Sequence, residues 1–350
     1  MCYTVFRAFD TQFAAESAHM RCGITSHHNM QKKKASKMKS KFPVSKETLA
    51  LAAAAMASVF FGLSFIFVKQ SVDAVSTFTL LSWRFVFALA GMYIAKLLRI
   101  IKLDLKGKPL KPLLLVALFQ PIIYYILETV GIAMTTATES GIIIACIPIV
   151  TIILSAVMLK EPPTKRQTVS VLISVLGIII MVLAKGISAS LNVLGYVLLI
   201  LTTVSAGLYV IYARKAVGYT SVEKTFIMSA TGAIAFTLCA IVEHASAGTM
   251  KEFLLLPFTN RDFLVSLLYL AGACSVLATL LRNYAITVIG ATRTASLAVL
   301  TTAISVFAGV LLLKEPFSFL QGVATVLVLI GVYGANKMPK HTHTGIVERK

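Results

Sequence analysis

The chain has 350 residues, of which 57% are hydrophobic and only 13% are charged, and its formal net charge is +19. An ordinary soluble domain carries about 25% charged residues, so the composition excludes that class. The positive charge does not indicate a nucleic-acid partner, because the lysines and arginines are concentrated in residues 1–46 and in short connectors between apolar stretches. Such a distribution is typical of a membrane protein.

The first 46 residues are polar and basic, with three consecutive lysines at 32–34. They contain no apolar core of a signal peptide. We expect a disordered tail whose lysines can touch anionic lipid headgroups. Met38 would make a natural start directly before the first apolar stretch, and residues 1–37 would then be an upstream extension.

Ten apolar stretches follow, each close to the roughly 20 residues that a spanning helix needs. They cover residues 49–68, 77–98, 112–134, 138–158, 167–184, 193–212, 224–242, 263–286, 292–313 and 319–336. The connectors leave almost no chain for a soluble domain. We therefore predict an all-α polytopic membrane protein with ten transmembrane helices, whose surroundings are the lipid bilayer.

The chain also repeats itself. The sequence Leu-Lys-Glu-Pro occurs at 159–162 and again at 313–316, and at the same offset of 154 residues Ala137 and Thr138 recur as Ala291 and Thr292. Five helices in each half are an odd number, so the second half must enter the membrane the other way up. We predict two inverted five-helix repeats, residues 47–187 and 188–337, followed by a tail of residues 338–350. Inverted repeats are associated with alternating access.

The distribution of lysine and arginine predicts the orientation. Of the 33 such residues, 25 lie in the tails and connectors on the side of both termini, and 5 lie on the opposite side. By the positive-inside rule both termini are cytoplasmic, and we expect a multi-pass protein of the plasma or inner cell membrane. Arg84, Arg282 and Arg293 remain, within or at the edge of helices.

Charged residues inside the membrane need compensation, because each costs about 2.5 to 3.5 kcal/mol at the bilayer centre on insertion scales. Arg84 and Glu128 lie at a similar depth, about 10 Å from the outer ends of their helices at 1.5 Å per residue. We hypothesise that they form an ion pair with Glu128 facing a cavity; a purely structural pair is the alternative. Glu128 is also a candidate for proton coupling, because burial disfavours its charged form, an effect that Arg84 would oppose.

Arg282 has two interpretations. It either snorkels to the cytoplasmic headgroups or faces the cavity with Arg293, where two cations would suit a carboxylate or phosphate group. Tyrosines supply further candidate contacts, and because Tyr124 and Tyr125 are adjacent on a helix, at most one of them points squarely inward.

Glu139 is explained without a function in binding. It lies in the first turn of a predicted helix, where an acid is stabilised by the helix dipole. Thr136 and Thr138 can cap the same end.

Several of these residues stand in a characteristic order: Phe61-Gly62-Leu63-Ser64-Phe65 with Lys69, Arg84-Phe85, the two segments around Leu-Lys-Glu-Pro, Arg282-Asn283-Tyr284-Ala285 and Ala291-Thr292-Arg293. Over residues 49 to 337 the chain resembles the EamA-type branch of the drug/metabolite transporter superfamily, with Phe61 where such proteins often carry tryptophan. The resemblance implies that helices one, three, four, six, eight and nine surround a central cavity, with five and ten peripheral. Our candidates for its lining are Ser64, Phe65, Arg84, Tyr124, Tyr125, Glu128, Tyr209, Arg282, Asn283 and Tyr284.

Enzyme motifs are missing from the sequence. It has no GxxxxGK[ST] phosphate loop and no HExxH motif, and its five cysteines show no paired spacing. We therefore expect neither an enzyme nor a cofactor or metal. We predict a secondary transporter of a small organic solute, such as an amino acid, metabolite or drug-like compound, and an exporter, because many relatives in the family excrete such compounds. An uptake permease and a non-transporting scaffold or lipid-interacting protein are the alternatives.

Overall fold

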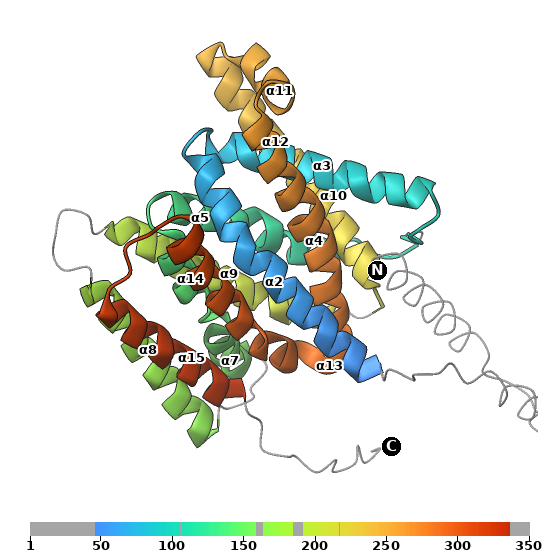
Figure 1. The fold of residues 1–350 in the computed structure, drawn as a ribbon. Coiled ribbons are helices and arrows are strands. Elements are labelled where there is room, and N and C mark those ends of the chain that lie inside the picture. Colours follow the sequence, from blue (N-terminus) through green and yellow to red (C-terminus); the bar gives the residue numbers. More distant parts are fainter. Residues whose placement is uncertain (1–45, 106, 159–163, 185–191, 217, 337–350) are drawn as a thin grey trace, which may run out of the picture.

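The computed structural model describes residues 46–105, 107–158, 164–184, 192–216 and 218–336. These residues form helices and connectors, with no strand among them (Figure 1). The first half contains α2 (Lys46–Val72), α3 (Thr77–Leu97), α4 (Lys111–Ala117), the π-helical segment η2 (Leu118–Ile123), α5 (Tyr124–Ala133), α6 (Ala137–Ile144), α7 (Ile147–Met158) and α8 (Lys165–Ala184). The second half contains α9 (Val193–Lys215), α10 (Ser221–Ala247), α11 (Met250–Thr259), α12 (Arg261–Leu268), the π-helical segment η3 (Tyr269–Ala278), α13 (Thr279–Ser296), α14 (Ala298–Leu312) and α15 (Phe319–Asn336).

Many of these helices are long and apolar enough to cross a bilayer. Seven such spans lie in the described part of the chain: Lys46–Val72, Thr77–Leu97, Lys111–Ala133, Ala137–Met158, Val193–Lys215, Ser221–Ala247 and Arg261–Gly290. Two shorter apolar helices are Leu300–Leu312 and Phe319–Gly334, and α8 has 20 residues. The chain is therefore built as a multi-pass membrane protein.

Three of the predicted stretches contain breaks. The third is interrupted at η2, where Pro121 removes a backbone donor and Gln120 leaves the helical region with φ −146° and ψ 113°. The fourth is divided at a turn into α6 and α7, and the ninth is divided at Leu297. α11 lies in a connector where the sequence predicted no helix.

Side chains fix several helix ends. Thr136 and Glu139 form a capping box at α6, in which the threonine oxygen accepts from the Glu139 N–H and the carboxylate accepts from the Thr136 N–H. Thr220 and Glu223 form the same arrangement at α10. Such boxes satisfy backbone donors that the helix leaves free. The capping role expected for Thr136 is thus confirmed, whereas the hydroxyl of Thr138, expected to cap the same end, has no hydrogen-bond partner in the described structure.

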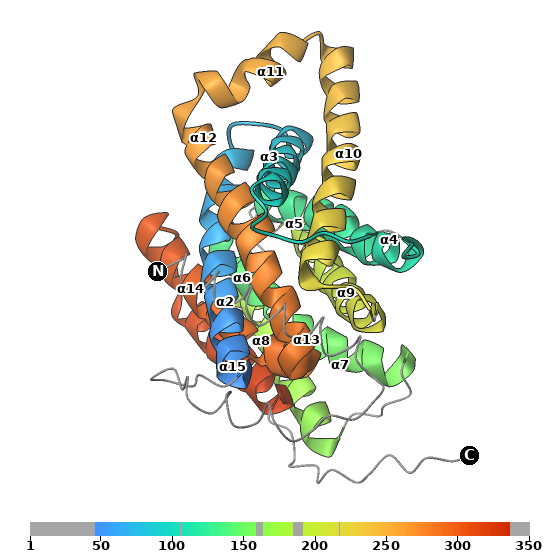
Figure 2. The ribbon, with the colours of Figure 1, turned by 90° about the vertical axis from the view of Figure 1, so that its right-hand side faces the viewer.

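The helices pack in an ordered way around the middle of the bundle. α8 and α15 pack together at one edge, and α3 packs against α10 (Figures 1 and 2). In the centre, α2 packs against α13 and α14, while α9 packs against α5 and α7. Each half therefore contributes one helix, α2 or α9, that contacts mainly the other helices facing the centre.

Candidate functional site: a charged cavity between the two halves

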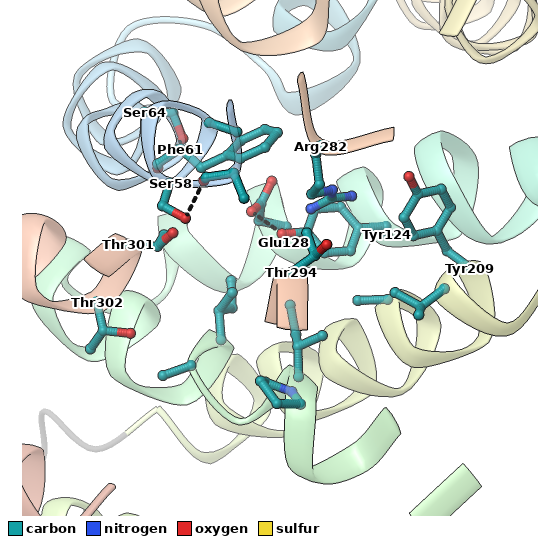
Figure 3. A pocket seen from close by; sticks show the side chains of 18 of the residues that line it. Ser58, Phe61, Ser64, Tyr124, Glu128, Tyr209, Arg282, Thr294, Thr301 and Thr302 are labelled. Carbon is teal, nitrogen blue, oxygen red and sulfur yellow. Dashed lines mark hydrogen bonds between the residues drawn. The ribbon is translucent and has the colours of Figure 1, made fainter. Parts of the chain in front are cut away.

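A cavity of about 90 Å³ lies at the centre of the bundle, and its walls come from both halves of the chain (Figure 3). It is lined by residues of α2, α5, α6, α7, α9, α13 and α14, and by Ala145 between α6 and α7: Ala54, Ala57, Ser58, Phe61, Ser64, Phe65, Tyr124, Glu128, Ile144, Ala145, Ile147, Pro148, Ala206, Tyr209, Val210, Arg282, Ile286, Thr294, Thr301 and Thr302.

The segments that line the cavity are the ones that the resemblance to the EamA-type family implied. The lining segments belong to the first, third, fourth, sixth, eighth and ninth predicted stretches, and no lining residue comes from α8 or α15. Both of these helices lie at one edge of the bundle (Figure 1). The apolar lining residues outnumber the polar ones, as is common for sites that take small organic molecules.

Glu128 supplies the acid of the cavity. Its side chain is 7% exposed, and Oε1 accepts a hydrogen bond of 2.7 Å from the hydroxyl of Tyr124, one helical turn earlier on α5. Ser58, Phe61 and Ser64 of α2 lie across the pocket from this pair (Figure 3). The hydroxyls of Ser58 and Ser64 donate to backbone carbonyls of their own helix, Ala54 and Phe61, at 3.0 and 2.7 Å.

Arg282 supplies the positive charge of the cavity. Its Nη2 donates to Oε1 of Gln120 at 2.5 Å, and its guanidinium carbon lies 5.0 Å from the ring centroids of both Phe61 and Tyr209. Its Nε is buried without a hydrogen-bond acceptor in the described structure. Arg282 thus lines the cavity, as in the second of its two interpretations; the part of that interpretation that concerns Arg293 is not tested.

Glu128 and Arg282 do not form an ion pair with each other. Both side chains are described, and no ion pair within 4.0 Å joins Glu128 to Arg282. Each is held by neutral polar or aromatic neighbours instead. The cavity therefore contains one carboxylate and one guanidinium that do not form an ion pair with each other.

Tyr209 is held in place from behind the cavity wall. Its hydroxyl donates to Oδ1 of Asn283 at 2.6 Å, and Nδ2 of Asn283 donates to the hydroxyl of Thr225 at 3.0 Å. Asn283 is 2% exposed and is not among the lining residues. Asn283 therefore holds the hydroxyl of Tyr209, and the ring of Tyr209 packs against the guanidinium of Arg282.

The hypothesised ion pair between Arg84 and Glu128 is wrong for this structure. Arg84 is 1% exposed, its Nε donates to the hydroxyl of Ser275 at 2.8 Å, and no ion pair within 4.0 Å joins it to Glu128, which is also described. Its guanidinium carbon lies 4.3 Å from the ring centroid of Tyr125. The similar depth expected from the sequence therefore does not bring the two charges within ion-pair distance.

Six of the ten candidates line the cavity: Ser64, Phe65, Tyr124, Glu128, Tyr209 and Arg282. The other four lie behind the wall. Tyr125 packs against Phe85, in agreement with the expectation that at most one of the adjacent tyrosines faces inward, and Tyr284 is buried in a cluster with Ala50 and Ala53. The side chain of Arg293 and the first Leu-Lys-Glu-Pro, at 159–162, lie outside the described residues.

Part of the site was not predicted from the sequence. Phe61 was noted only for its departure from tryptophan, and Gln120, the partner of Arg282, was not noted at all. Its position before Pro121 within an apolar stretch was the available signal, because a helix broken in a membrane exposes polar groups only where they face a cavity or other protein. In the described residues no group of three or more His, Cys, Asp or Glu could hold a metal.

The fold and the cavity are those of a multi-pass membrane transporter. Two consecutive segments, residues 48–183 and 193–337, match the EamA-like transporter family. The chain therefore belongs to that family, and the resemblance identified from the sequence is confirmed.

Similar proteins are known from bacteria and archaea. The chain is 33% identical over 294 residues to the uncharacterized transporter YcxC of Bacillus subtilis (strain 168), covering 83% of this chain and 93% of the relative. It is 25% identical over 285 residues to an uncharacterized transporter of Archaeoglobus fulgidus, covering 80% of this chain and 95% of the relative. A solved crystal structure with 18% identity superposes with a TM-score of 0.56 over 82% of this chain and 95% of the other, which shows a shared fold alone.

Proposed function

We propose that the protein is a secondary transporter that moves a small organic solute by alternating access. The observation that carries this proposal is the cavity, in which Glu128 and Arg282 face a common space between the two halves of a multi-pass membrane protein. Charged residues at this depth are costly and mark solute pathways. A non-transporting scaffold would gain nothing from keeping them there.

We further propose ten transmembrane helices in two inverted repeats, residues 47–187 and 188–337. Equivalent contacts in the two halves support this arrangement. α2 packs against α13 as α9 packs against α5, and α2 packs against α14 as α9 packs against α7. The π-helical segments η2 and η3 also stand in the third predicted stretch of the first half and in its counterpart, the eighth.

The charges of the cavity favour a solute that is a zwitterion, such as an amino acid. A carboxylate would accept from Arg282, whose Nε–H has no acceptor in the described structure, and an ammonium group would donate to Glu128. Hydrogen bonds between charged groups are stronger than neutral ones. The aromatic and aliphatic remainder of the lining would contact the rest of the solute.

We propose export across the plasma or inner cell membrane, with both termini in the cytoplasm. The excess of lysine and arginine on the side of the termini supports this orientation. Uptake by the same route is the alternative within transport.

Transport by purified protein in proteoliposomes tests the proposal. The panel comprises amino acids, nucleosides, organic acids and cationic drugs, each with and without a pH gradient. We expect saturable flux of at least one zwitterionic solute. Absence of flux for the whole panel, from protein that is monodisperse in detergent, would favour the scaffold, while flux that rises linearly with concentration would indicate a channel.

A further inference from the structure

Two charged side chains from distant parts of the chain hold the turn between α5 and α6. Nζ of Lys69, in the last turn of α2, donates to the carbonyls of Ile132 and Ala133 at 3.3 and 3.2 Å, at the end of α5. Glu315, in the connector between α14 and α15, accepts from the backbone N–H groups of Ala137 and Thr138 at 2.8 and 2.9 Å, at the start of α6.

In both contacts the charge of the side chain is opposite to the partial charge of the helix end that it meets. The carbonyl end of a helix carries partial negative charge and the N–H end partial positive charge, so a cation suits α5 and an anion suits α6. Glu315 uses one carboxylate oxygen for each N–H, which makes the contact geometrically specific as well as charged. The turn is therefore fixed at both of its ends by other elements.

The local backbone aims Glu315 at α6. α14 ends at Leu312, Lys314 adopts a left-handed conformation with φ 54°, and the N–H of Glu315 donates back to the carbonyl of Gly309 at 3.2 Å. A Cβ on Gly309 would lie 2.4 Å from Oγ1 of Thr138 and 2.7 Å from Oε2 of Glu315. Only glycine lets α14 approach α6 this closely.

The contact lies beyond one end of the cavity lining. α5 carries Tyr124 and Glu128 into the lining, and α6 and α7 carry Ile144 and Pro148, so the turn between α5 and α6 joins two walls of the cavity. On α2 the lining runs from Ala54 to Phe65. Lys69 lies one turn beyond Phe65, at the same end as the turn and Glu315.

Both partners of this contact belong to the duplicated sequence. Glu315 is in the second Leu-Lys-Glu-Pro, and Ala137-Thr138 is the dipeptide that recurs as Ala291-Thr292. The contact thus joins a repeated motif of the second half to a repeated motif of the first. A link between the two halves is the kind of contact that must change when the halves move against each other.

We propose that Glu315 is a positioning residue for transport: its paired hydrogen bonds to α6 form a latch that closes this end of the cavity and that opens during the transport cycle. The inference rests on the proposed function. Without the latch, the outer ends of α6 and α14 separate and the cavity becomes accessible from this side. The carboxylate acts through α6 and does not contact the solute.

Accessibility of a cavity cysteine tests the latch. The test protein is the full chain with its native cysteines replaced and with Ser64→Cys added. A second protein, which carries Glu252→Cys instead, identifies the side of the membrane to be tested as the side from which it reacts with a membrane-impermeant maleimide. The same reagent is then added to the test protein from that side. Glu252 belongs to α11, whose Phe253 carbonyl accepts from Trp83 near the start of α3, and it marks the same end as Glu315. Labelling from each side is measured in sealed vesicles.

Two different changes open the latch. Glu315→Gln removes the charge and one acceptor oxygen, while Gly309→Ala keeps the carboxylate and wedges α14 away from α6. We expect each to raise the rate of labelling in the Ser64→Cys protein from this side by about tenfold, equivalent to about 1.4 kcal/mol in the equilibrium between closed and open states. The matched controls, Glu252→Gln and Gly322→Ala, should not change it; a Cβ on Gly322 meets only a ring carbon of Phe317 at 3.6 Å.

The outcomes separate the latch from the function. Unchanged labelling in both folded variants, with saturable transport by the unmodified protein, overturns the latch and leaves the transporter intact. An equal rise from both sides of the membrane also overturns it, because general loosening would have that effect. Failure of the unmodified protein to move any solute overturns the proposed function itself.

Discussion

Arg282 and Glu128 share a buried cavity without an ion pair between them. Neutral partners hold each group: Gln120 for the guanidinium and Tyr124 for the carboxylate. The rings of Phe61 and Tyr209 flank the cation, and contacts of this kind stabilise a desolvated cation by about 2 kcal/mol. At the scale of the residue, this arrangement supports the proposed zwitterionic solute.

Replacement of Arg282 tests the anionic end of this site. Arg282→Gln should weaken binding of a zwitterionic solute by at least about tenfold, because a hydrogen bond to a charged group contributes about 1.5 to 3 kcal/mol. Binding of the corresponding amine, which lacks the carboxylate, should not change. Calorimetry on the purified protein measures both.

Arg261→Gln is the control for the loss of a positive charge, since Arg261 is exposed at the start of α12. Equal weakening of the zwitterion and the amine in Arg282→Gln would contradict the assignment, because it would indicate a general change in the shape of the cavity.

Glu128 allows a separate test of proton coupling. If its carboxylate carries the coupled proton, Glu128→Gln should retain exchange of solute across the membrane but lose accumulation driven by a pH gradient. Uptake into proteoliposomes with and without the gradient distinguishes the two activities. The exposed Glu252→Gln should keep both, and accumulation by Glu128→Gln equal to that of the unmodified protein would exclude this carboxylate as the coupling group.

At the scale of the element, α8 and α15 pack so closely that their contact depends on glycine. A Cβ on Gly331 would lie 2.0 Å from Oγ of Ser174 and 2.6 Å from the carbonyl of Ser170. Without a hydrophobic driving force inside the bilayer, such close approach is what holds helices together. Neither helix contributes to the cavity, so this contact serves stability.

Gly331→Ala should therefore destabilise the protein by about 1 to 3 kcal/mol, as overpacking does, and leave the KM for the solute unchanged. Gly91→Ala is the matched control, because a Cβ there meets no atom within 4 Å. Thermal unfolding in detergent and a saturation curve in proteoliposomes provide the two readouts. A changed KM with unaltered stability would contradict a purely structural role.

The sequence predicted helices well and their side-chain partners poorly. Hydropathy placed the helical stretches within a few residues, because apolar runs of this length have few other structures available in a bilayer. It did not give the partners of the Arg84 side chain, and so missed Ser275, 191 residues away. It showed both Ala137-Thr138 and the second Leu-Lys-Glu-Pro, yet only the packing of α14 against α6 reveals that Glu315 caps Ala137 and Thr138.

At the scale of the whole molecule, the two halves make equivalent contacts but carry different charges. The helix pairs around α2 and α9 correspond, whereas Glu128 of α5 and Arg282 of α13 have no like-charged counterparts in the cavity lining. A symmetric scaffold supplies the movement in our account. In the same account, the asymmetric side chains supply the selectivity for the solute.

The proposed orientation predicts which surfaces reagents reach. A cysteine at Glu252, in α11, should react with an impermeant maleimide in intact cells, whereas a cysteine at Lys102, in the connector between α3 and α4, should react only after permeabilisation. Lys102 follows the end of α3, whereas α11 contacts α3 nearer its start through the hydrogen bond from Trp83 to the carbonyl of Phe253; both positions are exposed. The reverse pattern would place the termini outside the cell and contradict the orientation inferred from the charges.

Counterflow tests alternating access in the cavity most directly. Proteoliposomes loaded with a high concentration of an unlabelled zwitterionic solute are diluted into a trace of the labelled solute, with no pH gradient. The account predicts a transient accumulation of label above equilibrium that saturates with concentration and is lost in Arg282→Gln but kept in Arg261→Gln. Entry of label that never exceeds equilibrium, or an equal overshoot in Arg282→Gln, would contradict transport through this cavity.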